Sequence, residues 1–475
     1  MSTTQEYRKT ITGDEDSGEY RDHIATVDEK GRRIWVYPKK PSGPLYNART
    51  LVSLILLALF FGGPFITISG RPILLLNFLE RKFYIFGIAF WPQDLHLFGL
   101  TFITLVVFIV LFTVVFGRLF CGWACPQTVF MEMVFRKIEY WIEGDAAAQR
   151  KLNAAPWSAG KLFKKSLKLG IFYAISFVIS NAFLAYIIGK DALFRIISEP
   201  VTEHLGGFAA MVIFSFVFFG VFAWFREQVC VLICPYGRLQ GVLLDQNSVV
   251  VHYDFVRGEP RGKGKRNADS KLGDCIDCRQ CVVVCPIGID IRNGTQLECV
   301  NCTACIDACN TIMTKVNRPK GLIRYTSYNG IKEGAQRLLT PRMAGYSAVL
   351  STLVILLAVL LATRAPVEST ILRIPGVMYQ ELPDGRLRNL YNIKVVNKTY
   401  QVKPIKLRLT QPVGGSITMV SELVVPEDDL QQSAFFVDLP RSLVTGNSVP
   451  LEIQVWSDGK LLETVKTAFI GPASN

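Results

Sequence analysis

Apolar residues along the chain gather into five long runs, at 51–68, 97–116, 169–188, 205–225 and 343–363. Each run approaches the roughly 20 residues with which a helix crosses the ~30 Å hydrocarbon layer of a bilayer. None of them shows the polar face that a helix of a soluble protein keeps toward water, which disfavours five buried soluble helices. The pattern therefore predicts a polytopic α-helical membrane protein with about five spans.

A further apolar stretch, PILLLNFLERKFYIFGIAFW at 72–91, is interrupted by charge. Glu80, Arg81 and Lys82 stand at its middle, where each would cost roughly 2.5–3.5 kcal/mol at the centre of a bilayer. We therefore expect an interfacial or re-entrant segment on the outer side of the membrane.

From about residue 366 the hydrophobic pattern changes to a period of two. The runs YNIKVVNKTYQ, KPIKLRLTQ, SELVVPED, SAFFVDLP and PLEIQVWSDGKLLETVKTAFIG alternate β-branched or aromatic residues with polar ones. SDGK between two such runs predicts a hairpin turn in which glycine supplies a positive φ. Several short strands at this spacing predict a β-sandwich, and its lack of a metal-ligand set favours a docking or interaction role.

The net charge of +13 is distributed around the apolar runs. Lys and Arg gather in RRIWVYPKK before the first run and in KLFKKSLK before the third, which is the positive-inside pattern of cytoplasmic loops. The charge therefore reports topology, and no nucleic-acid partner is expected. Counting the runs from a cytoplasmic N-terminus without a secretory signal places 127–168 and 228–342 in the cytoplasm and the C-terminal domain outside.

All twelve cysteines lie between 121 and 309, on the predicted cytoplasmic face. Thiol clusters in a reducing compartment favour metal binding or redox chemistry over disulfides. Eight of the cysteines form DCIDCRQCVVVCP and ECVNCTACIDACN. This is C-x2-C-x2-C-x3-C twice, the bacterial ferredoxin run for two 4Fe–4S clusters, in which the fourth cysteine of each run reaches the other cluster.

The interlocked run assigns each cluster a set of ligands. We expect one cluster to be bound by Cys275, Cys278, Cys281 and Cys309, and the other by Cys299, Cys302, Cys305 and Cys285. Structural zinc is disfavoured, since it needs one set of four ligands and not two interlocked sets. Asn310 stands where proline usually follows the second run, which leaves the ligands intact but changes the local turn.

The other four cysteines form two copies of C-x-x-x-C-P. FGRLFCGWACPQ carries Cys121 and Cys125, and WFREQVCVLICPYG carries Cys230 and Cys234, each directly after an apolar run. Because i and i+4 side chains share a helix face, each pair could point its thiols together before the proline ends the helix. Two such pairs could converge on a pocket for Cu(I), zinc or iron–sulfur iron. Small residues packed at helix ends are the alternative.

Other cofactors lack support. The four histidines, His23, His96, His204 and His252, all lie outside the apolar runs, so a bis-histidine haem within the bilayer is not expected. A pair of outer-face metal ligands at His96 and His204 is conceivable, but isolated surface histidines are favoured. Without a G-x-G-x-x-G after a strand or a Walker loop, nothing indicates NAD, flavin or ATP. The clusters imply one-electron transfer, with no certain catalytic residue.

These observations divide the chain into five expected regions. They are a cytoplasmic N-terminal segment (1–48), a four-helix membrane region with the two C-x-x-x-C-P motifs (49–228), a cytoplasmic ferredoxin-like segment (229–342), a fifth transmembrane helix (343–363) and an outer β domain (364–475).

The order of these motifs, together with SGRPILLLNFLERKFYIFGIAFWPQD, resembles one family from about residue 30 onward. The chain is similar to the CcoG proteins, also called FixG or RdxA. The paired C-x-x-x-C-P motifs also resemble those of the membrane electron-transfer proteins NapH and NosR. The GRP…FWPQD stretch and an immunoglobulin-like tail favour CcoG.

The resemblance implies an oxidoreductase, a cupric reductase that converts Cu(II) to Cu(I) for assembly of a cbb-type cytochrome c oxidase. It implies 4Fe–4S clusters on the eight cysteines, copper handling or a further redox site at the other four, and a bacterial inner membrane with a periplasmic C-terminal domain. Copper ions, copper chaperones, the oxidase assembly machinery and an unidentified electron donor are the expected partners, and a homodimer is left open. A quinone-linked electron conduit and a non-enzymatic assembly scaffold remain alternatives.

Overall fold

The computed structural model describes residues 26–472 apart from 28–29, 31, 69, 79–81, 92–93, 264–271, 336–338 and 377. His23, Glu80 and Arg81 therefore lie outside the described residues. The chain divides into two compact units. The first holds four of the membrane helices, the fifth up to Ile355 and the cysteine-rich segment, and the second holds the end of the fifth helix and the C-terminal β domain.

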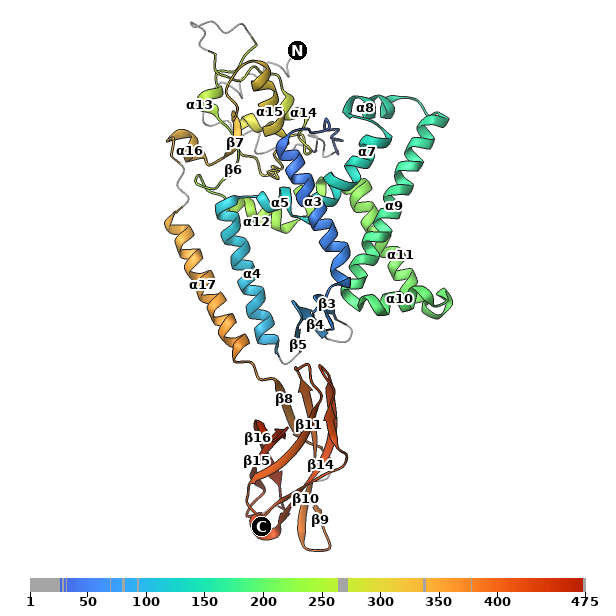
Figure 1. Cartoon of the computed structure of the whole chain (residues 1–475), viewed down its shortest axis with the longest axis vertical. Coiled ribbons are helices and arrows are strands. Elements are labelled where there is room, and N and C mark those ends of the chain that lie inside the picture. The colour runs from blue at the N-terminus through green and yellow to red at the C-terminus, as the bar shows by residue number, and fades with distance from the viewer. Residues whose placement is uncertain are drawn as a thin grey trace. The chain divides into compact units, whose positions relative to one another are not determined.

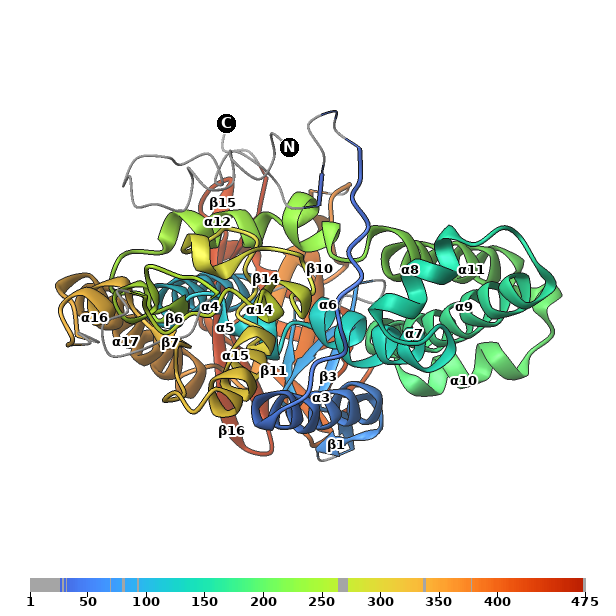
Figure 2. The same ribbon diagram turned by 90° about the horizontal axis from the view of Figure 1, so that it is seen from above.

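Five helices among the described residues are long and apolar enough to cross a membrane, as the hydrophobic pattern predicts. They are Pro44–Phe65 (α3, Pro44–Gly62, with the 3-10 turn η1, Gly63–Phe65), Leu95–Phe116 (α4), Ala159–Ile188 (α9), Val201–Phe225 (η4, Val201–His204; α11, Leu205–Gly220; η5, Val221–Phe225) and Pro341–Ala362 (α17). Helices α9 and α11 lie side by side (Figures 1 and 2), where Tyr173 packs on Phe216 at 4.7 Å between ring centroids.

Short helices connect the spans of the first unit. They are α5 (Leu119–Trp123), α6 (Pro126–Thr128), the π-helix η3 (Val129–Phe135), α7 (Arg136–Ile142), α8 (Ala146–Ala154), α10 (Lys190–Ser198), the π-helix η6 (Val229–Ile233) and α12 (Pro235–Leu243). In each C-x-x-x-C-P motif the first cysteine therefore lies in a short helix, α5 or η6, and the second lies in the break before the next helix.

In its described residues, the charged stretch after α3 forms strands and no helix. Its strands are β1 (Thr67–Ile68), β2 (Arg71–Pro72), β3 (Leu74–Asn77), β4 (Lys82–Ile85) and β5 (Ile88–Phe90). β3 pairs antiparallel with β4, which sets the buried Leu75 opposite the buried Tyr84. Alternating burial across a hairpin explains the apolar composition without a sixth span.

The cysteine-rich segment folds around one two-stranded sheet and short helices. β6 (Val250–Tyr253) pairs antiparallel with β7 (Ile323–Thr326). Around it lie α13 (Phe255–Gly258), α14 (Gln280–Val283), η7 (Ile291–Asn293), α15 (Ala304–Lys315) and α16 (Tyr328–Lys332). Asp307 on α15 accepts hydrogen bonds from the backbone N–H groups of Leu45 (3.4 Å) and Tyr46 (2.8 Å). A carboxylate thus caps the N-terminus of the first span and ties it to this segment.

The C-terminal domain is the expected sandwich of two antiparallel sheets. One sheet has the order β12-β14-β10-β8, with β9 on β10, and the other has the order β13-β11-β15-β16. Their bounds are β8 Val367–Arg373, β9 Gln380–Glu381, β10 Arg386–Asn397, β11 Lys403–Gln411, β12 Ser416–Met419, β13 Leu423–Val425, β14 Leu430–Pro440, β15 Ser448–Ser457 and β16 Lys460–Ile470. Asp458 (φ 51°) and Gly459 (φ 76°) form the predicted hairpin turn, in which both central residues need positive φ.

Two short pieces of chain near the strands β1–β5, 70–71 and 87–91, belong to the same compact unit as this domain. The Arg71 guanidinium lies 4.2 Å from the centroid of the Tyr400 ring and 3.4 Å from the Asp428 carboxylate. The Trp91 indole N–H also donates to Asp428, at 3.3 Å. The arginine and tryptophan of the GRP…FWPQD stretch therefore meet one carboxylate of the sandwich.

Candidate metal centres

The two ferredoxin-type runs adopt the same backbone turn. Asp277 (φ 50°) and Arg279 (φ 56°) flank the second cysteine of the first run, and Asn301 (φ 54°) and Thr303 (φ 66°) flank the second cysteine of the second. Left-handed backbone is uncommon outside glycine, although Asp and Asn tolerate it better than most residues. Its recurrence at equivalent positions shows that each run wraps around its own central space.

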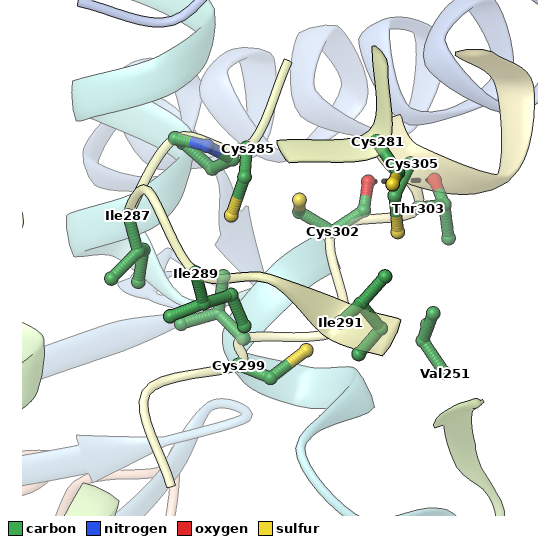
Figure 3. A pocket seen from close by; sticks show the side chains of 12 residues that line it. Val251, Cys281, Cys285, Ile287, Ile289, Ile291, Cys299, Cys302, Thr303 and Cys305 are labelled. Carbon is green, nitrogen blue, oxygen red and sulfur yellow. Dashed lines mark hydrogen bonds between the residues drawn. The ribbon is translucent and has the colours of Figure 1, made fainter. Parts of the chain in front are cut away.

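The eight cysteines of these runs line two cavities. One is lined by Cys275, Cys278, Cys281 and Cys309, here called the first cluster set. The other is lined by Cys285, Cys299, Cys302 and Cys305, the second cluster set, whose side chains surround one space in Figure 3. Cys281 also borders the second cavity. The structure thus brings the fourth cysteine of each run to the other run, the arrangement that the spacing predicts.

The chemistry of the second cavity fits a thiolate-bound cluster. Burial raises the pKa of Cys299 to about 11 and also raises the pKa of Cys302 and Cys285. Backbone N–H groups of Ile287 and Ile289 point at the Cys285 sulfur and oppose that rise in its pKa. Buried thiols of this kind stay protonated until a metal displaces the proton, and N–H donors to sulfur are a feature of iron–sulfur sites.

The two C-x-x-x-C-P motifs share an unexpected local conformation. Gly117 (φ 55°, ψ −130°) ends α4 four residues before Cys121, and Arg226 (φ 53°, ψ −122°) ends η5 four residues before Cys230. In each copy the second cysteine is extended, Cys125 at φ −61°, ψ 126° and Cys234 at φ −69°, ψ 110°. The duplication is therefore structural as well as sequential.

Each cysteine pair spans a wide turn, so the expected i, i+4 helix face is wrong in detail. The Cys125 N–H donates to the Phe120 carbonyl and the Cys234 N–H to the Val229 carbonyl, both five residues back. The second cysteine leaves the helical region because the following proline disfavours it there. Each proline then begins the next short helix, α6 or α12.

These four cysteines, here called the thiol set, are close neighbours. Burial raises the pKa of Cys230 to about 12, and the thiols of Cys125, Cys121 and Cys234 raise it further. Burial likewise raises the pKa of Cys121 to about 11. Among the described residues, no three of these sulfurs lie within 4.8 Å of one another.

The thiol set packs directly against the second cluster set. A Cβ on Gly122 would lie 2.4 Å from the Val300 carbonyl oxygen and 2.8 Å from that of Asn301, so only glycine fits between the two loops. Cys121 belongs to the same apolar cluster as Val300, which also contains Cys285, Cys299 and Cys302. The two sets of thiols therefore share one core.

A hydrogen-bonded chain joins the same two loops. The Trp123 indole N–H donates to the Tyr325 hydroxyl at 3.1 Å, and that hydroxyl donates to the Asn301 carbonyl at 2.9 Å. Trp123 lies between the cysteines of the first C-x-x-x-C-P copy, and Asn301 lies between two cluster cysteines.

A larger cavity, of about 860 Å³, reaches the thiol set from the side of β6. Cys230 and Arg118 line it together with His252, Asp245 and Glu298. Burial lowers the pKa of His252 to about 4, so its imidazole is neutral at physiological pH. Cys230 is the one cysteine of the thiol set among the residues found to line this cavity.

His204 proves to have acidic neighbours. His204 Nε2 lies 2.5 Å from a Glu199 carboxylate oxygen, and Glu203 completes the one set of three ligand atoms within 4.8 Å found among the described residues. His96 is not part of this set. The set is largely exposed, and exposed acidic groups are common without a metal ion.

Sequence reasoning missed the residues that join the two thiol sets. Gly122 and Trp123 lie inside the CGWACP motif. A glycine next to a tryptophan between two cysteines could have indicated a close contact with another part of the chain. Arg49, whose Nε donates to the Gly122 carbonyl at 2.6 Å, stands as a lone cation at the start of the first span. Its partner lies far away in sequence, so no local pattern shows the contact.

Comparison with known proteins agrees with this architecture. Family models match for a 4Fe–4S binding domain over residues 98–145, a 4Fe–4S dicluster domain over 225–328 and the Ig-like fold at the C-terminus of FixG over 357–472. The chain is 32% identical to protein RdxA of Cereibacter sphaeroides, covering 80% of this chain and 83% of RdxA. It is 32% identical to nitrogen fixation protein FixG of Rhizobium meliloti, covering 87% of each. Protein RdxB of Cereibacter sphaeroides is 29% identical over 90% of this chain and 93% of its own length.

Five apolar helices and a two-run ferredoxin segment define a membrane-bound iron–sulfur electron-transfer protein. Within that class, the identity to RdxA and FixG and the matching C-terminal domain are specific. The chain belongs to the FixG/RdxA family.

Proposed function

We propose that this protein is a cupric reductase, in which the two cluster sets hold 4Fe–4S clusters and the thiol set takes the copper. The observation that carries the proposal is the packing of Gly122 against the Val300–Asn301 backbone. It leaves no room for a side chain between the second cluster set and the thiol set. Bound clusters would supply one electron at a time, which is the stoichiometry of Cu(II) reduction.

The thiol set has the chemistry to hold the reduced ion. Soft thiolates favour Cu(I) over harder cations, so a thiol pair stabilises the product of the one-electron step. Burial keeps Cys121 and Cys230 protonated at neutral pH, and binding of copper to a pair would release two protons. In a balanced step Cu(II) would gain the one electron that a bound cluster supplies, and the protons of the thiol pair would leave to water.

The cavity beside β6 is the proposed route of the ion. It exposes Cys230 and carries the neutral imidazole of His252 and the carboxylates of Asp245 and Glu298. Imidazole and carboxylate groups suit Cu(II), whereas the thiols beyond them suit Cu(I). Reduction would therefore draw the ion inward, from the cavity to the thiol set.

The family and the basic loops support a proposal for the cellular setting. We propose a bacterial inner-membrane location with a cytoplasmic N-terminus and a periplasmic C-terminal domain. Copper chaperones would carry Cu(I) onward to a cbb-type cytochrome c oxidase under assembly. An unidentified donor would reduce the clusters.

The test is Cu(II) reduction by the anaerobically purified full chain, reduced beforehand and followed with a Cu(I)-specific chelator. Loss of Cu(I) formation is expected in C278S/C302S, which removes one ligand from each cluster set, and in C121S/C125S/C230S/C234S. The matched control is E199Q/H204Q, which removes two ligands of the exposed acidic set and should leave the rate unchanged. Undiminished reduction in either cysteine variant would refute the proposal.

The same preparation discriminates the alternatives. Rapid cluster reduction by a quinol analogue, with no Cu(I) formed, would identify a quinone-linked conduit. Normal oxidase activity in cells whose C278S/C302S protein still accumulates would identify a scaffold.

A further inference from the structure

Arg118 is a buried cation whose partners are neutral. Only 5% of its surface is exposed, and its guanidinium donates to the Gln240 side-chain oxygen at 3.0 Å and to the carbonyls of Leu297 and Gly237. Among the described residues no carboxylate lies within ion-pair distance of it. A buried charge without a counter-ion is costly, so an anion of another kind should be nearby.

Arg49 is a second buried cation of this kind. It is 3% exposed, its Nε bonds the Gly122 carbonyl, and its Nη2 is buried without a hydrogen-bond partner in the part of the chain that the structure describes. No carboxylate forms an ion pair with it there either. Both cations lie beside the second cluster loop. Arg118 donates to the Leu297 carbonyl, two residues before Cys299. Arg49 donates to the Gly122 carbonyl, and Gly122 packs on the Val300–Asn301 backbone between Cys299 and Cys302.

The first cluster set has a different charge environment. Arg292 acts on Cys281 but is paired with Asp277 and Asp290, both at 2.6 Å. Arg257 acts on Cys309 and is likewise paired with a carboxylate, that of Asp274. The cations at the first set are therefore ion-paired with carboxylates, whereas the two at the second set are uncompensated by any ion pair among the described residues. Glu132 and Glu298 act on Cys302 and Cys299, but less strongly than the two arginines do.

We propose that the uncompensated charges of Arg49 and Arg118 raise the reduction potential of the second cluster site above that of the first. Adding an electron to a buried site makes it more negative, and a nearby cation stabilises that state. An electron exchanged between the two cluster sites would therefore favour the second site, which packs against the thiol set. This inference rests on the cluster assignment but not on copper being the substrate.

The test is a potentiometric titration of the full-length protein, followed by electron paramagnetic resonance, with iron counted in every sample. The signal of the second site is the one lost in C302S. In wild type this signal is expected to titrate at the higher potential. R118Q and R49Q are each expected to lower the midpoint potential of the second site by at least about 59 mV, which is a tenfold change in the equilibrium constant for one electron. The midpoint potential of the first site should stay unchanged.

The lysine variants separate charge from packing. R118K and R49K keep the charge but lose the guanidinium geometry, and they should keep most of the wild-type potential. R195Q removes one exposed arginine on α10 and should change neither midpoint, because exposed distant charge is screened. If R118Q loses iron, the midpoint of R49Q tests the proposal instead. The Arg49 side chain makes only one hydrogen bond among the described residues, so its replacement disturbs less structure.

Unchanged midpoint potentials in iron-replete R49Q and R118Q would overturn the proposal. So would lysine variants whose second-site midpoint potential is lowered as much as in the glutamine variants. A failed Cu(II) assay with the expected midpoints would reject copper as substrate and leave the charge arrangement standing. Wild-type midpoints in reverse order would reject the charge arrangement alone.

Discussion

Replacing Gly122 by alanine should increase the separation between the thiol set and the second cluster set. The added Cβ would stand 2.4 Å from the Val300 carbonyl oxygen, against an ordinary contact of 3.4 Å or more, so the two loops must separate by about 1 Å. Both opposing atoms are backbone, which cannot rotate away. Overpacking of this kind costs typically about 1–3 kcal/mol, or roughly a 5- to 150-fold weaker closure of the contact.

Hydrogen exchange measures that closure locally. In G122A the amides around Val300 and Asn301 should lose about 5- to 150-fold of their protection, while the iron content stays at the wild-type value because every thiol is kept. Cu(I) formation should slow in parallel. The matched control is G99A in α4, where a Cβ meets nothing within 4 Å. Wild-type protection at these amides in G122A would refute the packing argument.

Three further changes probe the elements around the site. D307A removes the cap of α3 and should destabilise its first turn by about 1 kcal/mol, seen as faster amide exchange there, whereas D307N should retain most of the protection. Burial alone would raise the pKa of Glu139, but Arg226, bonded to it at 2.7 and 2.8 Å, and other cations lower that pKa to about 2. The stability from this ion pair is therefore present above about pH 4.5 and lost as the pH falls toward 2; thermal melts of E139Q should lack this pH dependence, and an unchanged acid profile would contradict it. Y325F removes the hydroxyl between Trp123 and the cluster loop and should cost about 1 kcal/mol, with a shifted tryptophan emission; an identical spectrum and melting temperature would argue against the link.

Much of this architecture can be predicted from short-range patterns in the sequence. The spans are long apolar runs, the sandwich strands alternate at period two, and the eight cluster cysteines stand at a diagnostic spacing. Each of these signals depends on neighbours within a few residues. The hairpin at Asp458 and Gly459 was predictable for the same reason.

The contacts that give the site its character are of longer range. Gly122 meets Val300, and Arg49 meets Gly122, across large sequence separations, so no periodic pattern encodes them. The wide turn at Cys125 depends on how α5 and α6 pack, which helical spacing alone does not reveal. The charged stretch at 72–91 was ambiguous because an apolar run with an interruption suits a hairpin as well as a re-entrant segment.

The most direct test of the central claim is an anaerobic metal count with spectra, on wild type and on C121S/C125S/C230S/C234S, after incubation with Cu(II) and removal of loosely bound metal. Wild type should hold about eight iron atoms, with the spectra of two 4Fe–4S clusters, together with Cu(I). The variant should hold the same iron and spectra but no copper. Copper retained in the variant, or iron lost from it in proportion to the missing cysteines, would contradict the division of these twelve cysteines into two cluster sets and one copper-binding thiol set.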